Sequence, residues 1–380
     1  MTRRLLDSAP AAPAAGVLVA ALLLSGLAVQ GARAAAITPS LTYTADPFAV
    51  LGGDARDAGT YVHVVQAGGS YALSKQWAVV VQGAWTAGAS LSEKAVGDIA
   101  GVQGAFNNGD QIWLYQLQAT GTFKNGTISL GRLSSGDSFG ALPVMGEFAN
   151  SAFASNGGAI SVNDPGRATS PASSWGVTGS LTVSPALTLR GGAFLSDPAL
   201  FAGGFRGSRL AFKPNRGVLG FAEADVAVAK GWTFGVGGYA DSADISTFAG
   251  RPVGGNHGYY GFIDGALIAG AKASDPAKLE GFAVLQGAPA DRSLQPFFAM
   301  GGLVLRGPFG ARPKDVVAVA FQSGRISRFA GGGRETTLEA NYRITLNDHW
   351  GIRPDIQWVI GPNGRDSDAV VAGVQIEFGL

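Results

Sequence analysis

Hydrophobic and polar positions alternate along most of the stretch from Glu335 to the last residue, Leu380. The apolar side of this alternation holds Leu338, Ala340, Tyr342, Ile344, Leu346, Ile352, Ile356, Trp358, Ile360, Val370, Ala372, Val374, Ile376 and Phe378. A repeat of two residues is typical of β-strands with one apolar and one polar face. Because the apolar face continues to the end of the chain, the pattern predicts the closing strands of an outer-membrane β-barrel.

The same alternation, punctuated by Gly, Pro, Asn and Asp, predicts sixteen strands in an all-β, antiparallel, transmembrane barrel. They are Thr38–Ala45, Thr60–Leu73, Trp77–Thr86, Ile112–Phe123, Thr127–Leu133, Ser174–Val183, Leu187–Ser196, Gly217–Val228, Trp232–Asp241, Gly258–Ala271, Leu279–Gln286, Gln295–Arg306, Asp315–Gln322, Glu335–Leu346, Trp350–Val359 and Ala369–Phe378. Sixteen strands leave an aqueous channel, whereas about eight would be filled by side chains. The first strand has the weakest pattern, and a count higher or lower by two stays open.

Short and long connections alternate between these strands. The short ones are Ser74–Gln76, Lys124–Gly126, Ser184–Ala186, Ala229–Gly231 and Asn347–His349, and the long ones are Ala87–Gln111, Ser134–Ser173, Asp197–Arg216 and Ser242–His257. In outer-membrane barrels the short turns face the periplasm and the long loops face outward. Trp77, Trp232 and Trp350 directly follow three short turns, which predicts a girdle of tryptophans at the membrane interface. Tryptophans in a protein core are the alternative.

The longest connection, Ser134–Ser173, exceeds the ~12–15 residues of an ordinary loop. It carries Phe139, Phe148 and Phe153, apolar side chains that a solvated loop would not keep. The sequence therefore predicts a constriction loop that folds back into the barrel and narrows the pore. An extracellular cap that packs on itself is the alternative.

The beginning of the chain predicts a secretory signal peptide. Arg3 and Arg4 precede an apolar run over residues 16–29, and Ala32-Arg33-Ala34 offers small residues for cleavage after Ala34, with Ala36 as the alternative site. A transmembrane helix would need a longer run, of ~20 residues. We expect residues 1–34 to be removed and residues 35–380 to form a single porin domain in the outer membrane of a Gram-negative bacterium.

The composition of the mature chain excludes several function classes. It keeps 25 basic (28 − 3) and 26 acidic (27 − 1) residues, so it lacks the basic excess that nucleic-acid binding requires. Cysteine is absent, and His63, His257 and His349 lie far apart in sequence, so we expect no metal and no other cofactor. Glu223 and Asp225 resemble a catalytic acid pair only in spacing. No motif supports an enzyme.

The polar face of the last strands is the candidate site. A charge that faces lipid at the midplane costs ~2–4 kcal/mol, so these side chains are expected to line the lumen. They are Glu339, Asn341, Arg343, Arg353, Asp355 and Gln357. A field of one sign would select ions, whereas mixed charges with amides suit a neutral hydroxylated solute.

Several segments resemble the OprB-type carbohydrate-selective porins. They are Asn108–Leu117, Ile128–Leu133 with Asp137-Ser138-Phe139, Ser170-Pro171 with Ser174–Val177, Gly191–Phe194, Arg312–Asp315, Thr337–Tyr342 and Ile352–Gly364. The resemblance implies a sixteen-stranded channel for facilitated diffusion of sugars, with arginines and aromatic residues at a constriction. The chain departs from the family at Leu380, where an aromatic residue is commoner, and before Thr60.

Arg132 is the best match to a constriction arginine, and Asp137 lies in the same matching region. Straight alternation places Arg132 on the face of Ile128 and Leu130, so a bulge at Gly131 is needed to turn it inward. Without the bulge it is an interface residue at the strand end. Both readings stay open.

Together these features predict a passive porin for small hydrophilic solutes, most of all carbohydrates such as monosaccharides. Its partners would be the lipid bilayer, the sugars and, through the C-terminal strand, the barrel-assembly machinery. The alternatives are a general non-selective porin and a barrel that forms no channel, such as an adhesin.

Overall fold

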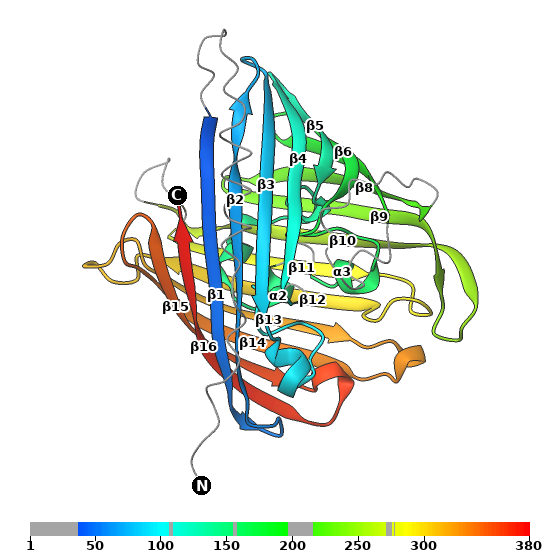
Figure 1. Ribbon diagram of the computed structural model, residues 1–380, viewed down its shortest axis with the longest axis vertical. Helices are drawn as coiled ribbons and strands as arrows, with labels where there is room; N and C mark the ends of the chain where they lie inside the picture. The colour runs from blue at the N-terminus through cyan, green and yellow to red at the C-terminus, as the bar shows by residue number, and fades with distance from the viewer. Residues whose placement is uncertain (1–36, 106–108, 155–157, 197–215, 271–275, 277) are drawn as a thin grey trace.

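The computed structural model describes residues 37–105, 109–154, 158–196, 216–270, 276 and 278–380, and all that follows concerns these residues. Sixteen antiparallel strands form a closed barrel, in which each strand pairs with its neighbours in sequence and β1 pairs with β16 (Figure 1). The strands are β1 (Ile37–Gly53), β2 (Gly59–Ala72), β3 (Trp77–Gly88), β4 (Gln111–Phe123), β5 (Gly126–Leu133), β6 (Ser174–Ser184), β7 (Leu187–Leu195), β8 (Val218–Ala229), β9 (Trp232–Ser246), β10 (Pro252–Ile268), β11 (Leu279–Gly287), β12 (Phe297–Arg306), β13 (Val316–Arg325), β14 (Arg334–Thr345), β15 (Trp350–Ile360) and β16 (Asp368–Gly379). No helix in the described ranges is long and apolar enough to cross a membrane.

The predicted fold class and the sixteen strands are confirmed. β1, predicted as Thr38–Ala45, continues to Gly53 and closes the barrel by pairing with β16 from Thr42↔Gly379 to Gly53↔Ala369. Pro47, which has no N–H to donate, lies in β1 where the pairing with β16 is interrupted between Ala45 and Phe48. The proline therefore does not end the strand.

One predicted connection is wrong. Residues 242–257 were expected to form a long loop, but β9 extends to Ser246 and β10 begins at Pro252. Gly255 adopts φ +84° at a register shift between Gly254 and Asn256, and this bulge lets the strand continue through glycine-rich sequence that resembles a loop. The predicted connection 197–216 lies outside the described residues except Arg216, and the predicted signal peptide lies outside them entirely.

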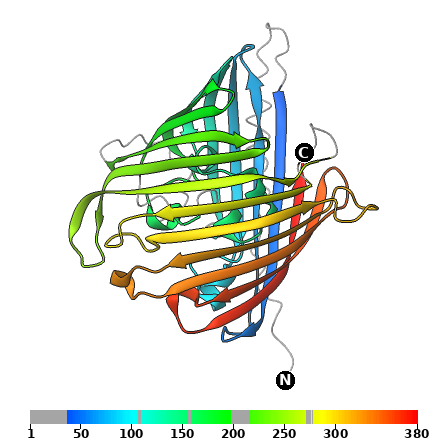
Figure 2. The same cartoon turned by 180° about the vertical axis from the view of Figure 1, so that it is seen from behind.

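The two ends of the barrel differ in their connections. At one end, called here the turn end, short connections join β2–β3, β4–β5, β6–β7, β8–β9 and β14–β15, and β1 begins and β16 finishes there. At the opposite end, the loop end, lie the connections over residues 89–110 and 134–173. Figure 2 shows the wall from β8 to β15, seen from behind.

The connection over residues 134–173 packs against the inner face of the wall. It contains the short helices η2 (Ser135–Asp137), η3 (Pro143–Glu147), α2 (Ser151–Ala154) and α3 (Ile160–Asn163), and both views place α2 and α3 within the barrel outline (Figures 1 and 2). Phe139 stacks on Phe221 of β8 with ring centroids 4.8 Å apart, and Phe148 lies 5.8 Å from Phe282 of β11. Aromatic burial of this kind holds the loop to the wall.

Candidate functional site: the barrel interior

The polar face of β14 and β15 points into the barrel. Glu339 is 2% exposed and Gln357 0%, whereas Leu338 and Trp358 on the opposite face are 42% and 44% exposed. The predicted orientation of Asn341, Arg343, Arg353 and Asp355 follows the same alternation. The structure thus brings the six predicted residues together, but all except Arg343 are buried.

Glu339 and Asn341 are buried because they hold the connection 134–173. The two carboxylate oxygens of Glu339 accept the backbone N–H groups of Ala149 (2.7 Å) and Asn150 (3.1 Å). The amide of Asn341 donates to the carbonyl of Glu147 at 3.0 Å. A charged acceptor strengthens a hydrogen bond, and a buried backbone N–H must find a partner. These residues therefore fasten the loop to the wall.

Gln357 holds both long connections at once. Its Oε1 accepts the side-chain amide of Asn150 at 3.0 Å, and its Nε2 donates to the carbonyl of Val102 at 3.0 Å. The same Nε2 also donates to Asp355 Oδ1 at 2.9 Å. Glu335, at the loop end of β14, accepts the backbone N–H groups of Ile99 and Ala100. The connection over residues 89–110 is thus held to the same wall.

Arg353 and Arg343 share one carboxylate. Arg353 Nη2 lies 2.8 Å from Glu377 Oε1, and Arg343 Nε lies 2.7 Å from Glu377 Oε2. Arg353 also donates to the Gly146 carbonyl at 3.0 Å and to Gln375 at 2.5 Å. Its side chain is 2% exposed and that of Arg343 33%, so Arg343 is the more accessible cation of the two.

Arg132 closes the base of the connection 134–173. Its guanidinium donates through Nε to Ser173 Oγ at 3.2 Å and through Nη2 to the Ser173 carbonyl, which ties the two ends of the connection together. Gly131 has φ +132°, a conformation that favours glycine, but the pairing of β5 with β4 and β6 shows no register shift there. Arg132 is 5% exposed. Its predicted contact with a solute stays a prediction.

Three buried carboxyl groups of the long connections have a raised pKa. Asp137 Oδ2 accepts Tyr115 Oη at 2.8 Å and Gln116 Nε2 at 3.2 Å, and burial raises the pKa of its carboxyl group. Burial also raises the pKa of Asp98. For Asp164, burial and the neighbouring Asp241 carboxylate raise the pKa to about 7. These groups titrate where loop and wall meet.

The polar interior side chains that the connections leave partly exposed include two sets. On β1–β4 they carry amides and hydroxyls: Ser40, Thr42, Gln66, Gln82, Gln116, Gln118 and Thr120. Two hydrogen bonds join members of this set, from Gln82 Nε2 to Ser40 Oγ at 3.0 Å and from Thr42 Oγ1 to Gln66 Oε1 at 3.3 Å. Gln66 Nε2 also donates to Ser170 Oγ of the long connection at 3.1 Å. We call this set the amide wall.

From β7 onward the interior carries charges instead. Arg190 lies 2.8 Å from Asp225 and 3.4 Å from Glu223, and Arg306 lies 2.8 Å from Glu280. With Arg343 and Glu377 they form what we call the charged wall. Glu223 and Asp225 face the same way, as their spacing predicted. Each of the three arginines has an acidic partner, and the four carboxylates outnumber the arginines by one, so the charged wall presents both signs at close range.

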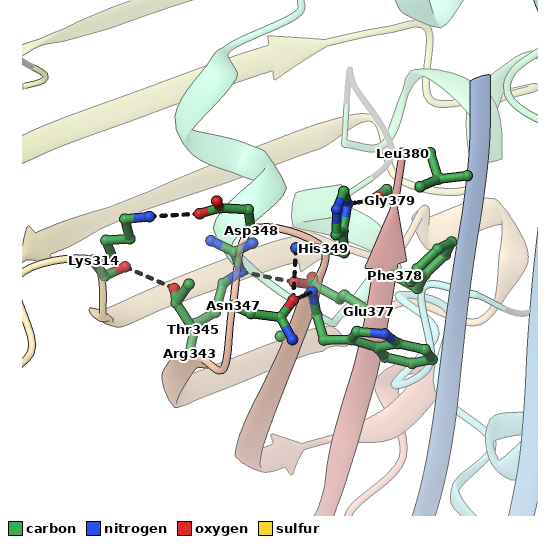
Figure 3. Close-up of a pocket in the computed structure, with 12 residues that line it drawn as sticks. Lys314, Arg343, Thr345, Asn347, Asp348, His349, Glu377, Phe378, Gly379 and Leu380 are labelled. Carbon is green, nitrogen blue, oxygen red and sulfur yellow. Dashed lines mark hydrogen bonds and ion pairs between the residues drawn. The ribbon is translucent and has the colours of Figure 1, made fainter. Parts of the chain in front are cut away.

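A cavity of about 640 Å³ opens at the turn end (Figure 3). Its lining includes Arg343 and Glu377 of the charged wall. The turn of β14–β15 forms its rim, where Asn347 Oδ1 accepts the N–H groups of His349 and Trp350. The accessible ion pair of Arg343 with Glu377 therefore borders open space on the side of the short turns.

The three predicted girdle tryptophans are the first residues of β3, β9 and β15, at the turn end. Trp350 lies 4.8 Å from Phe378, and Trp77 lies 6.0 Å from Phe123 in an edge-to-face arrangement. The Trp232 ring covers Gly265, where an added Cβ would approach it to 2.4 Å. The three tryptophans lie at the same level along the barrel axis, as those of a girdle do, and their contact with lipid stays a prediction.

The charged and amide walls include residues that the sequence reasoning missed. Gln66, Gln82 and Arg190 lie on polar positions of alternating strands, so the period of two was the signal that would have found them. Within the described part of the chain, no group of three His, Cys, Asp or Glu residues could hold a metal ion. The expectation of no enzyme activity stays a prediction.

Comparison with known proteins gives a family and a fold. The model of the "Carbohydrate-selective porin, OprB family" matches residues 75–380. The high-pH structure of Pseudomonas putida OprB is similar at a TM-score of 0.82 and 20% identity, over 90% of this chain and 94% of that chain. Its low-pH structure gives a TM-score of 0.59 at 16% identity, over 90% and 92%. Salmonella typhi OmpF in complex with daunomycin is similar at a TM-score of 0.57 and 10% identity, over 90% of this chain and 98% of that chain. No curated protein sequence matches the chain.

Proposed function

The chain belongs to the OprB family of carbohydrate-selective porins and is an outer-membrane porin for sugar diffusion, and we propose that the sugars it carries are small and neutral, such as monosaccharides. In this proposal a sugar enters at the loop end, passes the connection 134–173 and leaves at the turn end, which faces the periplasm. The observation that carries the proposal is the division of the interior into an amide wall and a charged wall.

The amide wall suits a solute with many hydroxyl groups. Gln66, Gln82, Gln116 and Gln118 each present a carbonyl acceptor and an N–H₂ donor, and a sugar hydroxyl both donates and accepts. These side chains are partly exposed and have no formal charge to attract an ion. Contacts of this kind are weak singly, so a sugar exchanges between them and still leaves, as conduction requires.

The charged wall adds stronger hydrogen bonds and presents both signs of charge rather than one. Arg190, Arg306 and Arg343 each pair with an acidic side chain while remaining partly exposed. A sugar that passes can accept from a guanidinium and donate to its carboxylate partner at the same time. A single-sign ring of charge would instead favour ions of the opposite sign.

The connection 134–173 supplies the constriction in this proposal. Its helices occupy part of the barrel interior. Its backbone donates to Glu339 from Ala149 and Asn150, and the side-chain amide of Asn150 donates to Gln357. Arg132 lies just before the connection and bonds to its last residue, and Asp137 lies near its start. In this proposal both residues hold the connection in position, and other side chains contact the sugar. We further propose that β16 is the segment that the barrel-assembly machinery reads.

Planar-bilayer conductance tests the proposal. Purified protein is expected to form open channels whose ion current falls in a concentration-dependent way when glucose is added, because a bound sugar obstructs the path of ions. A barrel with no conductance contradicts a channel. An open channel whose current responds to glucose no more than to an equally viscous solution of a larger polymer supports a general diffusion porin instead.

A further inference from the structure

Two arginines oppose each other on the outer face of the barrel at the loop end. Arg325 is the last residue of β13 and Arg334 the first of β14, and the register pairs them directly. Both are exposed, and alternation puts them on the same face as Phe321 and Leu338, which are 46% and 42% exposed. Like charges at directly opposed positions destabilise a sheet. Within the described residues, neither arginine has an ion pair that would relieve this repulsion.

The level of this pair is set by the length of β13. The strand has 10 residues, from Val316 at the turn end to Arg325, and a transmembrane strand needs ~9–11 residues to cross the hydrocarbon core. With the turn end in the periplasm, Arg325 and Arg334 stand where the outer leaflet's headgroups begin. They face the lipid side rather than the lumen, so sugar passage does not use them.

Two hydroxyl groups lie next to the arginine pair, on the side of the membrane core. Ser323 Oγ and Thr336 Oγ1 lie 3.0 Å apart, and Arg334 Nη1 donates to Ser323 Oγ at 2.9 Å. Ser323 pairs with Thr336 in the register, two residues from the arginine pair. We call Ser323, Arg325, Arg334 and Thr336 the arginine notch. It is a polar site on a face that is otherwise apolar.

Apolar side chains border the notch on two sides. Phe297 of β12 pairs with Arg325 and is 45% exposed. Below the hydroxyl groups, Gly301, Phe321, Leu338 and Trp358 follow one another in register across β12–β15. The Phe321 ring lies over Gly301, where an added Cβ would approach it to 3.4 Å. The surface thus offers two cations at the loop end and, toward the membrane core, apolar side chains that an acyl chain can contact.

We propose that the arginine notch binds a phosphate group of lipid A, the phosphorylated glycolipid of the outer leaflet. Arginine binds phosphate through parallel N–H···O contacts, and the neighbouring hydroxyl groups add donors. A phosphate between Arg325 and Arg334 removes the repulsion of the pair. The acyl chains lie on Phe321 and Leu338, and the sugar backbone lies against Phe297. The inference depends on residence in the outer membrane, not on sugar selectivity.

The test measures binding of diphosphorylated lipid A to the folded protein in detergent, by native mass spectrometry and by titration. The double variant R325Q/R334Q is expected to bind about tenfold more weakly, which corresponds to ~1.4 kcal/mol. The matched control K75Q/K230Q removes two exposed cations at the turn end and is expected to bind as the unmodified protein does. Heat-modifiable gel mobility verifies that both variants keep the folded barrel.

Different ligands distinguish the sources of the phosphate. Lipid A stripped of its phosphates is expected to bind as weakly to the unmodified protein as intact lipid A binds to R325Q/R334Q. Inorganic phosphate and phosphatidylglycerol, at equal concentration, are expected to compete poorly. Equal affinity for intact and stripped lipid A overturns the proposal, as does equal affinity of R325Q/R334Q and the control. Equal binding of phosphatidylglycerol contradicts the assignment to lipid A. Channel conductance is expected to be unchanged in R325Q/R334Q.

Discussion

Removing the carboxylate of Glu339 should release part of the connection 134–173 and widen the channel. In Glu339→Ala, the backbone N–H groups of Ala149 and Asn150 lose the acceptors that lie 2.7 and 3.1 Å away. Each unpaired buried donor costs ~1–3 kcal/mol, so docking of this segment weakens by ~2–6 kcal/mol. The phenylalanine contacts of the loop remain, so we expect frequent local undocking rather than complete release.

Single-channel recording measures this effect. Glu339→Ala is expected to show a larger mean conductance and more current noise than the unmodified channel, and limited proteolysis is expected to cut within residues 134–173 more rapidly. Leu338→Ala is the matched control, because Leu338 is the neighbouring residue on the outer face. If Glu339→Ala and Leu338→Ala give the same conductance, noise and cleavage rate, then Glu339 does not hold the loop.

Four further predictions address other parts of the structure. Burial and Asp241 raise the pKa of Asp164 to about 7, so the docked loop favours the neutral form of this carboxyl group. Docking of the loop should therefore weaken as the pH rises from about 4 to about 7. The rate of proteolysis within the loop should increase across this range in the unmodified protein and should not change with pH in Asp164→Asn. Arg353→Met removes buried contacts to Glu377, Gln375 and Gly146 and should lower barrel stability by ~3–5 kcal/mol, measured by unfolding in denaturant, with Arg251→Met as an exposed comparison. Gln66→Leu with Gln82→Leu should weaken the block of ion current by glucose while the current without sugar stays within a factor of two, and an unchanged block would contradict the role of the amide wall. Lipids brominated near the headgroup should quench the fluorescence of Trp77, Trp232 and Trp350 more strongly than lipids brominated near the chain ends. Fluorescence quenching that increases toward the chain ends would contradict a girdle.

The strands could be predicted because their signal is local. Alternation between Leu338 and Glu339 needs only neighbouring residues, and it placed the polar face of β14 and β15 correctly toward the interior. The same argument failed at residues 242–257, where a bulge at Gly255 continues the strand through a sequence that resembles a loop. A bulge changes the alternation locally, so a strict period of two does not detect it.

The roles of the interior residues could not be predicted in the same way. Glu339 and Asn150 are 189 residues apart in sequence, and Gln357 and Val102 are 255 apart. No local pattern connects such partners, so residues that sequence reasoning treats as exposed pore lining are buried beneath loops in the structure. The amide wall on β1–β4 was not predicted, because glutamine and serine give a weaker signal than charged residues.

Liposome swelling tests the central claim most directly, because it measures solute entry rather than ion current. Proteoliposomes should swell faster in isotonic glucose than in an isotonic neutral amino acid of similar size, and liposomes without protein should swell in neither. A hydroxyl-rich solute exchanges hydrogen bonds with the amide wall and the paired charges of the opposite wall, whereas a zwitterion of that size has fewer groups to do so. Equal swelling rates for the two solutes would contradict sugar passage by this mechanism.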